Sequence, residues 1–127
     1  MYKKILIFGD TGMLGSVLLK FSKNLGFLSY GCSRTSNDIR IDITDHKGVR
    51  NLLNKINPDV IINTVGLIDL DFCENNPFQT WNVNSNSIYN ICEWIKKKNK
   101  KIIYISTDQF FAYSKKKKIM RRILLVW

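Results

Sequence analysis

Nearly continuous apolar runs alternate with amphipathic stretches along most of the chain. The runs lie at 3–8, 27–32, 60–64 and 101–106, and glycine or polar residues bound them. Runs of this kind are typical of strands that are buried on both faces of a sheet. The pattern therefore predicts four such strands.

Between the runs, apolar residues recur at positions i, i+3, i+4 and i+7, which is the spacing of one helix face. The three stripes are Leu14, Val17, Leu18 and Phe21; Val49, Leu52, Leu53 and Ile56; and Ile88, Ile91, Cys92 and Ile95. The second helix is predicted over 45–56, and the third begins at Asn76-Pro77 with Asn76 as its cap. Strands that alternate with helices predict an α/β fold with a parallel sheet covered on both faces.

Three glycines lie between the first predicted strand and the first predicted helix, as Gly9-x-x-Gly12-x-x-Gly15. Gly9 allows a tight turn, Gly12 lets the backbone approach a pyrophosphate, and Gly15 lets the helix pack closely on the strand. The helix N-terminus then offers free N–H groups and a positive dipole end to phosphates. The arrangement predicts a dinucleotide site, the alternative being glycines that only shape a loop.

The residues after the second predicted strand bear on which dinucleotide binds. An acidic residue at this place would bind the ribose 2′-OH of NAD, but the chain has Ser33-Arg34. Arg34 could pair with the 2′-phosphate of NADP, which favours NADP over NAD, or it could be an ordinary solvated arginine. Asp42 could accept a hydrogen bond from adenine or cap the next helix, and Asp45 is the better candidate for the cap.

The formal net charge of +10 suggests nucleic acid as a partner, but its distribution argues against this. All ten acidic residues lie between Asp10 and Asp108, whereas six of the twenty basic residues lie at 115–122. Much of the excess charge thus belongs to a short tail, and neither nucleic acid nor a membrane is expected as a partner.

The numbers of cysteines and histidines indicate whether a metal site or disulfides are expected, and in which cellular compartment the protein is expected. The three cysteines form no CxxC pair and there is one histidine, so neither a disulfide scaffold nor a metal site is expected. No apolar run approaches the roughly 20 residues of a membrane span. A reducing, cytoplasmic location is expected.

Several motifs follow one another in the order of a known enzyme family. They are Ile5–Gly15, Asp42–Asp45, Pro58–Asn63, Asp71–Glu74, Val83-Asn84 and Tyr104–Phe111. Through them the chain resembles, over residues 3–112, the dTDP-4-dehydrorhamnose reductases among the extended short-chain dehydrogenases/reductases. The resemblance implies a Rossmann-type doubly wound parallel sheet that ends after about the fifth strand. It implies a partial NAD(P)-binding domain over 1–112 and leaves a basic and apolar tail over 113–127.

The resemblance also implies roles for single residues. Reductases of this kind transfer hydride from NADPH to a 4-keto-sugar nucleotide, and Thr107 corresponds to the residue whose hydroxyl polarises the keto group. Asn63 to Gly66 would line the cofactor, which is expected to be NADP, with NAD as the alternative. The residues expected to bind the cofactor are Gly9, Thr11, Gly12, Met13, Leu14, Gly15, Arg34, Asp42, Ile43, Asn63, Thr64 and Val65.

The match to the family ends soon after Thr107. The family's proton-donating Tyr-x-x-x-Lys pair should follow on a later helix, whereas Tyr113 and Lys117 have the right spacing but follow Thr107 too closely. We therefore expect little or no turnover from the chain. Four consecutive lysines favour a slip of the reading frame, so one hypothesis is that the tail is a frameshift product on an N-terminal piece of a reductase.

Two other functions remain open. The chain could be a non-catalytic dinucleotide-binding or regulatory subunit that binds a protein partner at an exposed sheet edge. It could also be a piece of an NAD-dependent sugar-nucleotide epimerase or dehydratase, because those enzymes share much of the motif set. In a full-length relative, the substrate would be a sugar nucleotide.

Overall fold

The strands and amphipathic helices that the apolar pattern predicts occur in the predicted order, with further short elements among them. The computed structural model describes residues 3–96, 98–105 and 125–126. In chain order the elements are β1 (Lys4–Phe8), α1 (Met13–Asn24), β2 (Leu28–Ser33), β3 (Ile39–Arg40), α2 (His46–Ile56), β4 (Val60–Asn63), α3 (Leu70–Asn75), α4 (Pro77–Trp81), the π-helix η1 (Asn82–Asn86), α5 (Ser87–Ile95), β5 (Lys101–Tyr104) and β6 (Leu125–Val126). The four predicted strands correspond to β1, β2, β4 and β5.

The strands form one sheet in the order β3-β2-β1-β4-β5-β6. The first five strands are parallel, and β1 lies between β2 and β4, with Leu6 opposite both Tyr30 and Ile61. The Rossmann-type parallel sheet is thus confirmed, and the short strand β6 adds an antiparallel pairing to β5. After β3 the chain crosses to the other half of the sheet, so the strand order reverses between the neighbouring strands β1 and β4. In open α/β folds, ligands bind at the place of such a reversal.

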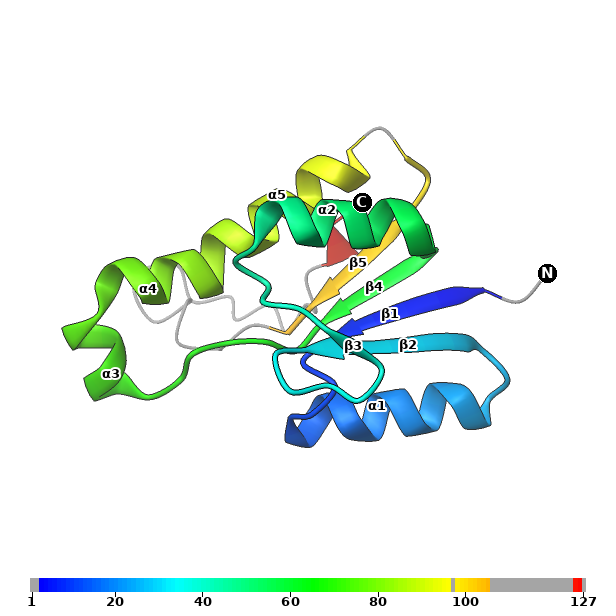
Figure 1. The fold of residues 1–127 in the computed structure, drawn as a ribbon, viewed down its shortest axis with the longest axis horizontal. Coiled ribbons are helices and arrows are strands. Elements are labelled where there is room, and N and C mark those ends of the chain that lie inside the picture. The colour runs from blue at the N-terminus through cyan, green and yellow to red at the C-terminus, as the bar shows by residue number, and fades with distance from the viewer. Residues whose placement is uncertain (1–2, 97, 106–124, 127) are drawn as a thin grey trace, which may run out of the picture.

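Helices cover the two faces of the sheet unequally. Figure 1 shows α2 and α5 together over one face and α1 on the other. The core lies between the sheet and the α2–α5 pair, where Leu6, Phe8, Val49, Leu53, Ile61, Ile91 and Ile102 are fully or almost fully buried. No helix in the described part of the chain is long and apolar enough to cross a membrane.

The two predicted helix caps have different outcomes. Asp45 caps α2 as predicted, because its Oδ1 accepts a hydrogen bond from the N–H of Gly48 at 3.0 Å. Asn76 precedes α4, but its side chain makes no cap bond. Instead, Asn76 Nδ2 donates to the carbonyl of Phe72 at 3.0 Å. The short helix α3 ends directly before α4, and its last carbonyl groups compete for the Asn76 side chain.

Helix α1 forms where predicted but presents an unexpected face to the sheet. Gly15 and Ser22 are its buried residues, whereas Leu14, Val17 and Phe21 of the predicted apolar stripe are 42%, 61% and 59% exposed. The reason is a close approach between α1 and the end of β1, which only small side chains permit. The apolar stripe therefore does not determine how α1 is rotated on the sheet.

Candidate functional site

A cleft of about 920 Å³ opens at the carboxyl ends of β1, β2 and β4. Four chain segments line it: the loop after β1, the segment after β2, the segment before α2 and the loop after β4. Residues from α3, α4 and η1 close one side of it. The cleft lies at the place where the strand order reverses, and its volume is within the roughly 300–1,000 Å³ of typical ligand sites.

The loop after β1 is shaped by backbone contacts that require glycine. Gly9 has φ +86°, and its N–H donates to the carbonyl of Cys32 at 2.8 Å. The N–H of Gly12 donates to the Gly9 carbonyl at 3.0 Å. A Cβ atom on Gly15 would overlap that same carbonyl oxygen and lie 2.7 Å from the carbonyl carbon. The loop thus leaves backbone and the N-terminus of α1 facing the cleft, which suits an anionic group.

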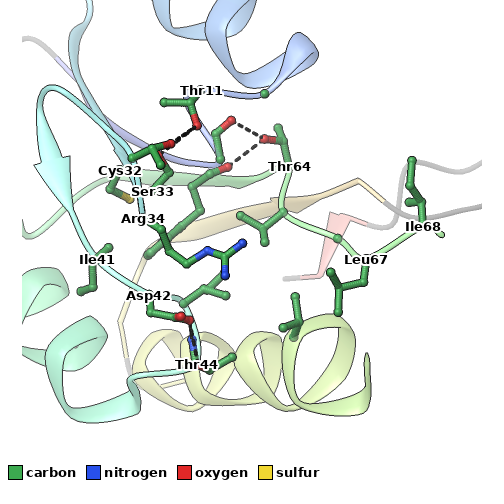
Figure 2. A pocket seen from close by; sticks show the side chains of 18 of the residues that line it. Thr11, Cys32, Ser33, Arg34, Ile41, Asp42, Thr44, Thr64, Leu67 and Ile68 are labelled. Carbon is green, nitrogen blue, oxygen red and sulfur yellow. Dashed lines mark hydrogen bonds between the residues drawn. The ribbon is translucent and has the colours of Figure 1, made fainter. Parts of the chain in front are cut away.

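Three hydroxyl groups meet where this loop approaches the segment after β2. Thr11 Oγ1 lies 3.1 Å from Ser33 Oγ and 3.1 Å from Thr35 Oγ1. Arg34 lies between the latter two residues, and Figure 2 shows its side chain extending across the cleft. Within the described part of the chain, Arg34 is in no ion pair. Its positive charge therefore lies in the cleft lining.

Asp42 lies on the side of the cleft opposite the Thr11 loop (Figure 2). Its Oδ1 accepts hydrogen bonds from the N–H of Thr44 at 2.9 Å and from Thr44 Oγ1 at 2.7 Å. Burial by itself raises the pKa of Asp42, but the two bonds from Thr44 and the charge of Arg34 lower it, so the net shift is downward. Asp42 is therefore an ionised acceptor in the cleft, while Asp45 serves as the helix cap.

Cys32 belongs to the wall of the cleft but cannot act as a nucleophile. Burial raises the pKa of its thiol strongly, and the charge of Asp10 raises it further. Its Sγ lies 3.5 Å from the carbonyl oxygen of Ile7. A neutral, buried thiol at this place is part of the packing.

The structure brings most of the predicted cofactor-binding residues into the cleft lining. Those that line it are Gly9, Thr11, Gly12, Arg34, Asp42, Ile43, Thr64 and Val65. Met13 and Leu14 are exposed at the start of α1, and Gly15 and Asn63 are buried beneath the cleft. Asn63 Oδ1 accepts a hydrogen bond from the N–H of Val65 at 3.0 Å. Asn63 therefore shapes the turn after β4.

The predicted catalytic residue cannot be placed. Thr107 lies outside the described residues, as do Tyr113 and Lys117. The same holds for the tail from 113 onward except Leu125–Val126, whose backbone forms β6.

Asn84 belongs to one of the motifs named above, but its role in the site was not predicted from the sequence. Asn84 clamps the loop after β4, because its Oδ1 accepts from the N–H of Leu67 at 2.8 Å and its Nδ2 donates to the Leu67 carbonyl at 2.9 Å. Asn84 lies in η1, and the hydroxyl of Tyr104 donates to its carbonyl at 2.9 Å. Isolated π-helical turns often occur at functional sites. Here the turn links β5 to the wall of the cleft.

Replacing Asn84 by alanine should destabilise the protein by about 2 kcal/mol, because both backbone groups of Leu67 lose their partner. Urea unfolding of the two proteins measures the difference. Asn75→Ala is the matched control, since it removes one exposed bond to the carbonyl of Asp71. If the two variants unfold at the same urea concentration, Asn84 does not clamp the loop.

Comparisons with known proteins point to one family. The family model of the RmlD substrate binding domain matches residues 3–121. A dTDP-4-dehydrorhamnose reductase of Escherichia coli is 33% identical over 107 residues, which cover 84% of this chain and 35% of the relative. The chain thus spans about a third of the length of that curated relative.

Solved structures have the same fold. A hypothetical dTDP-4-dehydrorhamnose reductase from Sulfolobus tokodaii is 27% identical, with a TM-score of 0.78, over 94% of this chain and 45% of that one. The Bacillus anthracis dTDP-4-dehydrorhamnose reductase in complex with NADP is 24% identical, with a TM-score of 0.76. The match covers 85% of this chain and 37% of that one.

Proposed function

Since the chain belongs to the RmlD substrate binding domain family, we propose that its cleft binds NADP as the N-terminal part of a sugar-nucleotide reductase. The reaction would be that of the dTDP-4-dehydrorhamnose reductases, in which the bound dinucleotide supplies a hydride to a keto sugar. The observation that supports the proposal most is the glycine loop that faces the same cleft as Arg34, which forms no ion pair with the described residues.

Each part of the cleft suits one part of the dinucleotide. The loop Gly9–Gly12 has no Cβ at its two glycines, so a diphosphate could approach closely, and backbone N–H groups at the N-terminus of α1 would hold it. Arg34 and the hydroxyls around Thr11 would hold the 2′-phosphate by charge-assisted hydrogen bonds. Thr64 and Val65 would lie along the cofactor at the end of β4. These groups bind and orient the cofactor, and none of them is proposed to move a proton.

The same proposal includes a sugar nucleotide as the substrate and Thr107 as a catalytic residue. The chain covers 35% of its curated relative, so the whole reaction is proposed for a family member of full length.

The second candidate is a dinucleotide-binding subunit without catalysis. The exposed apolar side chains of Met13, Val17 and Phe21 on α1 favour it, since such a surface suits a protein partner. Cofactor binding is common to both candidates, and turnover separates them.

Removing the charge of Arg34 tests the choice of cofactor. Arg34→Ala should weaken NADP⁺ binding about 30-fold and change NAD⁺ binding less than about twofold, because only the 2′-phosphate loses a charged partner. Titration calorimetry of the 127-residue chain with each nucleotide gives the two dissociation constants.

Arg50→Ala is the matched control for this experiment. Arg50 is an exposed arginine on α2, and its Nη2 donates to Asn90 Oδ1 at 3.2 Å, away from the cleft. It should leave both dissociation constants unchanged. Equal weakening of NADP⁺ and NAD⁺ by Arg34→Ala would contradict the assignment of Arg34 to the 2′-phosphate. Absence of binding to either nucleotide by the unaltered chain would contradict the proposed function itself.

A further inference from the structure

A buried acid joins the glycine loop to the segment that contains Arg34. Asp10 is 8% exposed although it lies directly after Gly9 in the loop. The hydroxyl of Ser36 donates to Asp10 Oδ2 at 2.5 Å, and Ser36 is 1% exposed. A carboxylate in such a place loses solvation, which costs free energy unless its bonds compensate. The bond from Ser36 therefore links two loops that are 26 residues apart in sequence.

Ser36 in turn fixes the shape of its own segment. Its Oγ accepts hydrogen bonds from the N–H groups of Asp38 at 3.0 Å and Ile39 at 3.2 Å. The backbone N–H of Ser36 donates to the Ser33 carbonyl at 3.4 Å. The turn between β2 and β3 is thus organised around one hydroxyl, and Asp10 holds that hydroxyl.

The space for the Asp10 side chain exists because position 31 is glycine. A Cβ atom on Gly31 would lie 2.5 Å from Asp10 Oδ2 and 2.7 Å from Asp10 Cβ. No larger residue at that position leaves room for the carboxylate. Asp10, Gly31 and Ser36 therefore fit together as one packed unit beneath the cleft.

The unit lies directly below the group of hydroxyls on the surface. Thr11 follows Asp10 and contacts Ser33 and Thr35, the two neighbours of Arg34 (Figure 2 shows the bond from Thr11 to Ser33). The segment 33–36 is thus attached to the glycine loop twice, once at the surface and once in the interior. Of these two attachments, only the interior one is shielded from water, so it is the stronger restraint on the backbone position of Arg34.

We propose that Asp10 and Ser36 are positioning residues that set the preference of the cleft for a nucleotide with a 2′-phosphate. The inference rests on the proposed function, because it concerns the same cofactor site. Neither residue would contact the ligand. They hold the backbone on both sides of Arg34 so that its guanidinium and the hydroxyls of Ser33 and Thr35 meet one phosphate group. Without the bond the segment would move, and the 2′-phosphate, which NAD lacks, would lose its fixed partners.

The test compares NADP⁺ and NAD⁺ binding by the 127-residue chain and its variants, measured by titration calorimetry. Asp10→Ala and Ser36→Ala should each weaken NADP⁺ about tenfold and NAD⁺ less than about twofold, because one charge-assisted bond is misplaced. Asp10→Asn keeps an acceptor oxygen for Ser36 and should retain most of the preference. Ser22→Ala is the control, since Ser22 is 7% exposed and donates only to the Leu19 carbonyl within α1.

The ratio of the two dissociation constants decides the outcome. A residue with a merely structural role would weaken both nucleotides equally, and that result would overturn the inference, as would an unchanged ratio in both alanine variants. If Asp10→Ala does not fold, as judged by circular dichroism, Ser36→Ala makes the same test with a smaller change. An unaltered chain that binds neither nucleotide contradicts the proposed function. If the unaltered chain prefers NADP⁺ and both alanine variants have the same ratio of dissociation constants, only this inference is contradicted.

Discussion

Replacing Gly15 by alanine is expected to destabilise the protein by about 3 kcal/mol, although alanine is the better helix former by about 1 kcal/mol. The new Cβ would overlap the carbonyl oxygen of Gly9 and lie 2.9 Å from Thr64 Oγ1. Either α1 moves away from the sheet or the loop after β1 changes shape. Both changes would also disturb the proposed diphosphate site, so NADP⁺ binding should fall together with stability.

Urea unfolding of Gly15→Ala and of a matched glycine variant measures this effect. Gly66→Ala is the control, because its added Cβ would meet nothing closer than Asn84 Oδ1 at 3.8 Å. It should change the free energy of unfolding by less than about 0.5 kcal/mol. A Gly15→Ala protein as stable as the unaltered chain would mean that α1 does not need its close approach to β1.

Phe8→Ala should cost about 4 kcal/mol, the typical loss for a large aromatic side chain removed from a core. Phe8 is 1% exposed and packs in the core beneath the cleft. Its carbonyl also accepts a hydrogen bond from the hydroxyl of Thr64 at 2.8 Å, and this bond holds the loop after β4. Because small domains are stable by only about 5–15 kcal/mol, the variant should be close to unfolding.

The same urea titration measures this loss through the shift of the midpoint. Phe78→Ala is the matched control, since Phe78 on α4 is 76% exposed. It should shift the free energy of unfolding by less than about 0.5 kcal/mol. Equal midpoints for the two phenylalanine variants would contradict the core assigned to Phe8.

The parts of the fold that were predicted correctly depend on local signals. Helix α2 is an example, since Asp45 caps it and Val49, Leu53 and Ile56 are buried on one face, as their spacing predicts. The glycine loop is another, because a strand, three spaced glycines and a helix are adjacent in sequence. Neighbouring residues determine both features, so no knowledge of the rest of the fold was required.

The rotation of α1 and the capping at Asn76 were not predictable in this way. The stripe Leu14, Val17 and Phe21 satisfies the helical period but is exposed, because the approach of Gly15 to Gly9 selects another face. Asn76 has the right residue type for a cap, yet the end of α3 offers it another partner. In both cases a local preference competes with a contact that only the assembled chain provides.

The strands β1, β2, β4 and β5, the apolar stripes of α2 and α5, the glycine loop and the arginine after β2 follow from the sequence alone. These features arise from backbone geometry and from the spacing of apolar residues over one or two helical turns. Only the folded chain brings Asp10 to Ser36 and Asn84 to Leu67. The partners are 26 and 17 residues apart. Contacts at such separations depend on how the elements pack, and no periodicity along the chain records them.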